Sequence, residues 1–201
     1  MHSSRMPLAA ALTGLAVALA ASTAAAQKRE LGAHEHGAGT LNIAIEKSKV
    51  EFELEVPGDD IVGFEHQAKT AKQKAAVEKA RKTLSGALAL FKLPTGAGCK
   101  LASAKVELHT EEAEKKADTK PAEGKHDHAH EKDHDEGGHT EFHATYALDC
   151  RAPEKLTEIA FDYFKTFRKA QKLTVTVVSD KGQKQYQVTR KAPRLVLGGN
   201  S

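Results

Sequence analysis

The strongest constraint on the fold is the alternation of apolar and polar residues in two neighbouring stretches. In TLNIAIE (residues 40–46) and in VEFELEV (residues 50–56), apolar side chains recur at every second position. A period of two is typical of a strand that buries one face, and the short polar interval between the stretches predicts a hairpin. Pro57 and Gly58 end the second strand.

The hydrophobic period then changes to that of a helix. Apolar residues recur at helical spacing, at Val77, Ala80, Leu84, Leu88 and Phe91. This pattern predicts a helix from about residue 66 to residue 91, with one face on the sheet and a basic face in water. Pro94 and the Gly-rich residues that follow it end this helix.

Further strands are predicted in the second half of the chain. Residues 101–109 and 139–150 are expected to be the arms of one long antiparallel pair. Residues 156–161 predict a short strand, and residues 163–170 predict a helical turn or two.

A second hairpin is predicted near the end of the chain, where residues 173–178 and 185–189 flank the turn SDKG (residues 179–182). The expected fold class is therefore α+β: a mainly antiparallel β-sheet of six or seven strands with one long helix.

Residues 110–138 interrupt the long antiparallel pair. This stretch is rich in Lys, Glu, Asp and His and has almost no apolar side chains. Such a composition cannot bury enough apolar surface to fold, so it predicts a disordered His-rich loop inserted into the domain.

The first 26 residues have the three parts of a secretory signal peptide. A short basic start is followed by an uncharged apolar run at residues 8–20 and by small residues at 24–26. The run is too short for a stable membrane span. We expect export to the periplasm and a single mature domain at residues 27–201.

The charge balance bears on possible partners. Loss of Arg5 with the signal peptide lowers the formal net charge from +3 to +2. Basic residues are mixed with acidic ones, which argues against nucleic-acid binding. No other apolar stretch approaches the length of a membrane span, so no membrane insertion is expected after cleavage of the signal peptide.

The two cysteines, Cys99 and Cys150, are predicted to form a disulfide in an oxidising compartment. A conflict of register accompanies this prediction. Pairing the apolar face of residues 106–108 with that of residues 142–144 places Cys99 opposite Arg151, one step away from Cys150. A β-bulge must intervene if the bond forms.

The histidines are the residues that point to chemistry. Ten of the eleven lie outside the signal peptide. The pattern HEH (residues 34–36) precedes the first strand, HTEFH (residues 139–143) begins the fourth, and His66 and His109 stand alone. The inserted loop adds His126, His128, His130 and His134.

The spacing of these histidines along extended segments predicts which of them share one face. Side chains two positions apart project to the same side, about 6–7 Å from each other. His34 and His36 therefore share one face, and His139, Glu141 and His143 share another. Imidazole and carboxylate groups suit Zn(II), which needs three or four converging ligands. One strand cannot supply them all, so His34, His36 or His66 is expected to close the site.

Two isolated histidines are open to simpler explanations. His109 fits an ordinary surface histidine. For His66, hydrogen bonding within the turn that opens the helix is an equal alternative to metal binding.

The loop histidines are interpreted as a flexible capture arm that binds Zn(II) weakly and in many ways. Because imidazole binds metal only when deprotonated, capture is expected to weaken as the pH falls through about 6.5.

The motif HEKDH (residues 130–134) matches the zinc-protease pattern HExxH. That chemistry requires both histidines on one rigid helix. Here the match lies in a polar stretch with no apolar face, so we do not expect an enzyme.

Several of these motifs, in this order, resemble the ZrgA family of bacterial periplasmic zinc-binding proteins. They are HEHG (residues 34–37), DDIVGFEH (residues 59–66), the His-rich insertion, HTEFH with Cys150 after it, and APRL (residues 192–195). The resemblance covers nearly all of the mature chain. It implies a part in zinc uptake and assigns the family's histidines to His34, His36, His66, His139 and His143.

The expected function is capture of Zn(II) in the periplasm and its delivery towards an ABC-type zinc importer or the solute-binding protein of that importer. Two alternatives stay open: a buffer that sequesters excess zinc, copper or nickel, and a zinc hydrolase. The metal condition that induces expression would separate the carrier from the buffer.

Overall fold

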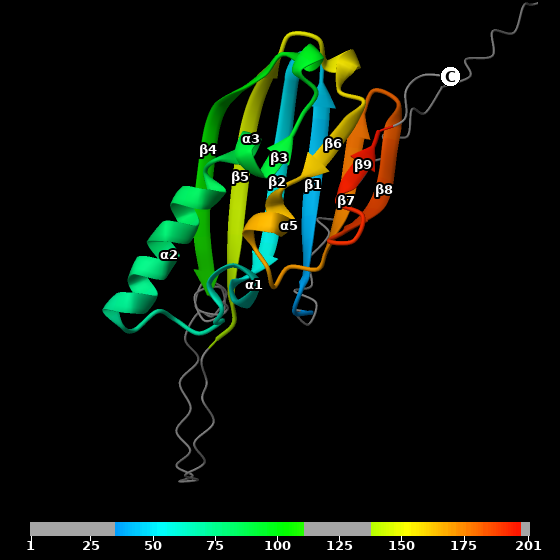
Figure 1. The fold of residues 1–201 in the computed structure, drawn as a ribbon. Coiled ribbons are helices and arrows are strands. Elements are labelled where there is room, and N and C mark those ends of the chain that lie inside the picture. The colour runs from blue at the N-terminus through cyan, green and yellow to red at the C-terminus, as the bar shows by residue number, and fades with distance from the viewer. Residues whose placement is uncertain (1–34, 111–137, 198–201) are drawn as a thin grey trace, which may run out of the picture. The chain divides into compact units, whose positions relative to one another are not determined.

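The computed structural model of the protein describes residues 35–110 and 138–197 (Figure 1). All of them belong to one compact unit. The predicted signal peptide and most of the predicted loop, residues 111–137, lie outside this description. No helix in the two described stretches is long and apolar enough to cross a membrane.

A six-stranded sheet forms the body of the domain, with the strand order β4-β5-β2-β1-β7-β8. Its strands are β1 (Ala38–Glu46), β2 (Lys49–Pro57), β4 (Cys99–Thr110), β5 (Thr140–Cys150), β7 (Lys172–Ser179) and β8 (Gly182–Thr189). Neighbouring strands are antiparallel, except that β1 and β7 are parallel. The mainly antiparallel sheet and both predicted hairpins are confirmed.

A second, three-stranded sheet has the order β3-β6-β9. It consists of β3 (Phe91–Lys92), β6 (Glu158–Phe161) and β9 (Arg194–Val196). The described residues thus contain nine strands, and the prediction of six or seven was too low. The two unexpected strands, β3 and β9, have two and three residues, which is too short for a period of two to show in the sequence.

The core lies between the two sheets. One face of the six-stranded sheet carries the small sheet together with α3 (Ala87–Leu90) and α5 (Tyr163–Thr166) (Figure 1). The Phe91 ring is fully buried there and meets the rings of Phe52 and Phe161, each at a centroid distance of 5.6 Å and nearly perpendicular. Such edge-to-face contacts are favoured by aromatic rings and tie the sheets together.

The helix expected at residues 66–91 is shorter, and its predicted bounds were wrong at both ends. Helix α2 (Ala71–Leu84) begins after Thr70, whose side chain forms a capping box with Gln73. It ends at Leu84 with Ser85 as its C-cap, and Gly86 precedes α3. A strong cap and a break at Gly86 override the apolar period that continues to Phe91, which itself lies in β3. The helix α1 (Gly58–Val62) was not predicted.

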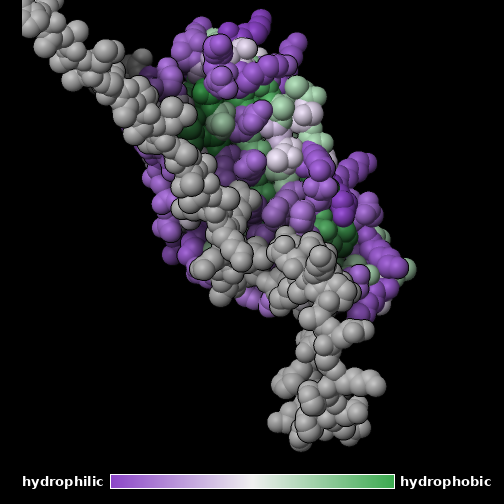
Figure 2. Space-filling model, turned by 180° about the vertical axis from the view of Figure 1, so that it is seen from behind, coloured by the Kyte–Doolittle hydropathy of each residue, from purple (hydrophilic) through white to green (hydrophobic). Residues whose placement is uncertain are grey.

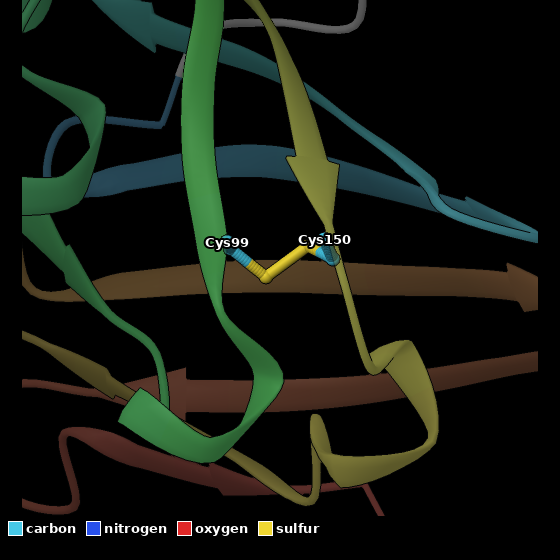
Figure 3. Close-up of a disulfide and its surroundings, with 2 residues drawn as sticks. All are labelled: Cys99 and Cys150. Atoms are coloured by element: carbon cyan, nitrogen blue, oxygen red, sulfur yellow. A yellow bond between two sulfur atoms is a disulfide. The ribbon is translucent and has the colours of Figure 1, made fainter.

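The disulfide prediction is confirmed together with its bulge. Cys99 and Cys150 face each other across β4 and β5 and are bonded (Figure 3). Val106 pairs with Ala144, as the apolar faces require, and the register shifts by one between Leu101 and Ser103. The extra residue in β4 is therefore Ala102. Two short 3-10 helices, Thr95–Ala97 and Pro153–Lys155, flank the bonded end.

Candidate metal centre

Three chain segments meet at the end of the sheet remote from the disulfide. The start of β1, the end of β2 and the start of β5 lie there, because Thr40 pairs with Glu55 and Pro57 pairs with Glu141. Helix α1 follows β2 directly at the same end (Figure 1). The sheet register thus brings His36, the residues after α1 and His139 into one region.

Close packing at Gly58 holds the loop after α1 beside β5. A Cβ atom at this glycine would lie 2.3 Å from Thr140 Oγ1 and 2.9 Å from the Phe64 carbonyl oxygen. Only a glycine permits this approach. The backbone that carries Glu65 is therefore fixed against the first residue of β5.

The carboxylate of Glu65 lies between two of the predicted ligands. Its Oε2 is 2.7 Å from His139 Nδ1, and its Oε1 is 3.7 Å from His36 Nδ1. The Glu65 side chain is only 12% exposed, whereas the two histidines are more than half exposed. A nearly buried acidic anchor with two accessible imidazoles results. We call His36, Glu65 and His139 the end cluster.

Asp59 approaches the same nitrogen of His36 that Glu65 approaches. Its Oδ2 is 3.5 Å from His36 Nδ1, and its Oδ1 accepts a 2.7 Å hydrogen bond from Lys169 Nζ. The hydrogen bond from Lys169 is the main reason that the pKa of Asp59 is lowered, and His36 adds to the effect. Asp59 is thus an ionised neighbour of the end cluster.

Asp60 positions the segment that carries His36. Its Oδ1 accepts a 2.8 Å hydrogen bond from the backbone N–H of Gly37, whose φ of 81° suits glycine. The Asp60 side chain is buried, and this burial raises its pKa, while the bond from Gly37 opposes the rise. The buried Asp60 carboxylate therefore fixes the turn that enters β1.

His66 lies in the turn rather than in the end cluster. Its ring stacks on Phe64 at a centroid distance of 5.0 Å, and its Nδ1 lies 3.0 Å from the Gln67 carbonyl oxygen. Its Nε2 is 3.4 Å from the side-chain amide of Gln73. These contacts match the turn-bonding alternative for His66.

The predicted triplet of β5 is divided between two places. Glu141 and His143 project from the same side of the strand and are in contact, with 2.8 Å between Oε2 and Nε2. His139 precedes the first residue of β5 and instead contacts Glu65. The parity rule holds within the strand and does not extend to the residue before it.

The donor atoms are near one another without forming a complete coordination sphere. Within residues 35–110 and 138–197, no group of three or more His, Cys, Asp or Glu side chains is already arranged to hold a metal ion. His34, His126, His128, His130 and His134 lie outside the described residues. The ligand set therefore stays a prediction.

One feature of the end cluster favours a nearby cation. Glu65 Oε1 is buried and has no hydrogen-bond donor among the described residues. A buried carboxylate oxygen without a donor is costly unless a positive charge or a metal compensates it. Two imidazole nitrogens and a carboxylate oxygen are also ligand types that zinc uses in proteins.

Sequence reasoning missed Glu65, Asp59 and Asp60 as members of this region. All three lie in the stretch DDIVGFEH, of which only His66 was predicted as a candidate ligand. The signal that could have found them is the density of carboxylates on both sides of the four-residue segment IVGF (residues 61–64).

The fold and the clustered donors define a candidate metal-binding protein built on a β-rich domain. The sequence matches the family described as ZrgA family zinc uptake protein over residues 33–197. The chain belongs to this family, which confirms the resemblance and supports a role in zinc uptake. No curated protein matches the chain.

Proposed function

We propose that the protein captures Zn(II) in the periplasm and passes it towards an ABC-type importer. The end cluster is the ordered binding site of this proposal. The observation that carries it is that His36 and His139, which are far apart in the sequence, approach the two oxygens of the nearly buried Glu65 carboxylate.

The exposure of the two imidazoles suits a carrier. Zinc binds imidazole nitrogen at about 2.0–2.1 Å and carboxylate oxygen at about 2.0–2.2 Å. His36 and His139 are 62% and 53% exposed, so their rings have room to turn towards a shared ion. Glu65 is held in place by its burial and supplies the fixed ligand.

A fourth ligand completes a tetrahedral site in this proposal. His34 is two positions before His36 in the sequence and is its candidate supplier. If water instead of His34 is the fourth ligand, the site resembles the open zinc sites of proteins. A competing ligand removes metal easily from such a site. Either arrangement is compatible with delivery to a partner.

Asp59 adds negative charge beside the ligands. Its Oδ1 is engaged by Lys169, whose Nζ lies 2.7 Å away. An ionised carboxylate near a neutral imidazole attracts a cation and orients the ring, as carboxylates beside metal-bound histidines do elsewhere. We assign Asp59 this orienting role.

The loop histidines form the capture arm of the proposal. His126, His128, His130 and His134 lie outside the described residues, so their part follows from sequence alone. Weak binding on this segment would raise the local zinc concentration near the end cluster, because residues 110 and 140 are paired at the same end of the sheet.

Calorimetric titration of the mature chain with Zn(II) tests the ordered site. Glu65→Gln keeps the shape of the side chain and removes its charge, and it should weaken the tightest zinc site by at least about tenfold. His36→Gln and His139→Gln should act in the same direction. His66→Gln is the matched control and should leave the tightest site unchanged.

A deletion of residues 124–138 separates the arm from the ordered site. The shortened chain should bind fewer ions but keep the tight site. Loss of all binding on deletion, or an unchanged titration of Glu65→Gln, would overturn the proposal.

A further inference from the structure

A second set of donors lies on the face of the large sheet that points away from the helices. Figure 2 views the molecule from behind and so looks onto this face, where hydrophilic side chains make up much of the surface that is not drawn in grey. Glu107 and His109 project from it on β4, and Glu141 and His143 project from it on β5. We call these four residues the open-face cluster.

The register of the strands arranges the open-face cluster as a two-by-two checkerboard. Glu107 is the direct partner of His143, and His109 is the direct partner of Glu141. Each histidine therefore has one carboxylate across the ladder and another two positions along its own strand. Directly opposed Cβ atoms lie about 4.5–5.5 Å apart in an antiparallel pair, which brings all four side chains within reach of one point.

The side chains already make contact across the checkerboard. The rings of His109 and His143 stack with centroids 4.2 Å apart and planes inclined by 21°. His143 Nε2 is 2.8 Å from Glu141 Oε2, and His109 Nε2 is 3.8 Å from Glu107 Oε2. Two imidazoles and two carboxylates thus gather in one place.

We propose that the open-face cluster is a second binding site for a borderline divalent cation, with His109 and His143 as nitrogen ligands and Glu141 as the principal oxygen ligand. This inference rests on the proposed function for the identity of the ion, Zn(II). It assigns Glu107 and His109 to metal binding, in contrast to the view of His109 as an ordinary surface histidine.

Burial divides the four residues into anchors and outer ligands. The Glu141 and His143 side chains are 17% and 28% exposed, whereas those of His109 and Glu107 are 38% and 48% exposed. β5 is paired on both sides, with β4 and with β2, so the two anchors stand on a rigid element. The outer ligands come from the edge strand β4.

A small rearrangement of the side chains completes the site. Two nitrogens bound to one tetrahedral zinc lie about 3.3 Å apart. Because the ring centroids lie 4.2 Å apart, the proposal requires the two rings to turn about their χ angles until a nitrogen of each faces the shared ion. Glu107 is also held by Lys105, with 2.9 Å between Oε2 and Nζ, so Glu107 serves as a weaker or later ligand.

The two clusters are adjacent but separate. His139 belongs to the end cluster and Glu141 to the open-face cluster, with the buried Thr140 between them. An ion on one cluster is therefore close to the other along β5. This arrangement gives the protein two ordered sites through which zinc can be handed on.

The experiment uses the full mature chain with His126, His128, His130 and His134 replaced by Gln, so that the arm does not contribute. Zinc stoichiometry by calorimetry is expected to be two ions per chain. His109→Gln together with His143→Gln should remove one ion, or weaken one site by at least about tenfold, and leave the other site unchanged. Glu65→Gln should affect the other ion, and His66→Gln should affect neither.

A second readout needs no substitution within the open-face cluster. In nitrogen-15 spectra of the imidazoles of that same chain, the signals of His109 and His143 should shift as Zn(II) is added. Unshifted signals at saturating zinc, or a double variant that keeps two ions, would overturn the open-face site. If those signals shift while Glu65→Gln has no effect, the open-face site stands and the end cluster fails.

Discussion

Removal of the disulfide should destabilise the domain without affecting zinc binding. The perturbation is Cys99→Ser together with Cys150→Ser. The bond joins residues separated by 51 positions. In the chain-entropy description, a closed loop of this length stabilises the folded state by about 4 kcal/mol at 25 °C. For a domain of this size, that is a large part of the free energy of unfolding.

The position of the bond explains why binding should be spared. Cys150 and Glu141 are nine positions apart on β5 (150 − 141 = 9), which at about 3.3 Å per residue separates them by about 30 Å. The bond fixes the first residues of β4, which is an edge strand and is paired only with β5. Its loss should loosen residues 99–101, which precede the bulge at Ala102.

Denaturant unfolding at pH 7 measures the first effect and zinc calorimetry the second. We expect the double variant to lose about 4 kcal/mol and to keep its zinc affinity within a factor of two or so. The control for the unfolding measurement is the unaltered chain, reduced with a phosphine and unfolded in the same denaturant. A loss below about 1 kcal/mol would refute the entropic reasoning, and a large fall in zinc affinity would refute the separation of the two ends.

Two buried tyrosines give matched predictions, both measured by denaturant unfolding. Tyr146 donates a 2.8 Å hydrogen bond to the Leu84 carbonyl oxygen, so Tyr146→Phe should cost about 1 kcal/mol. Tyr163 OH is buried without a hydrogen-bond partner among the described residues, so Tyr163→Phe should be neutral or stabilising. Burial raises the pKa of Tyr163 well above its ordinary value. Above about pH 10 the unfolded chain loses this proton while the folded chain keeps it, so stability should fall with rising pH. Tyr163→Phe should lessen that fall, and an identical alkaline profile in the variant would contradict the assignment.

Much of the sheet was predictable because it depends on local alternation. The strands of both hairpins follow directly from their apolar periods, and the bulge follows from the demand that Cys99 face Cys150 while Val106 faces Ala144. The parallel pairing of β1 with β7 was not predictable, because no local pattern records which strands far apart in the sequence become neighbours. The break of the helix at Gly86 was not predicted, because the apolar period of the helix continues past this glycine into β3.

The proximity of two candidate ligands was predicted, while the ligand set itself stays a prediction. The meeting of the N-terminal histidines with the start of β5 was expected, and His36 and His139 do approach one carboxylate. The carboxylate itself, Glu65, was missed because its place depends on the close packing of Gly58 against Thr140. The separation of His139 from His143 depends on where β5 begins, and a difference of one residue in that boundary decides which cluster His139 joins.

The most direct test of the account is a zinc-edge anomalous difference map from crystals of the zinc-loaded mature protein. The account predicts a peak about 2.0–2.2 Å from Glu65 and from the imidazole nitrogens of His36 and His139. Zinc found only on the histidines of residues 126–134, with His139 still bonded directly to Glu65, would contradict it.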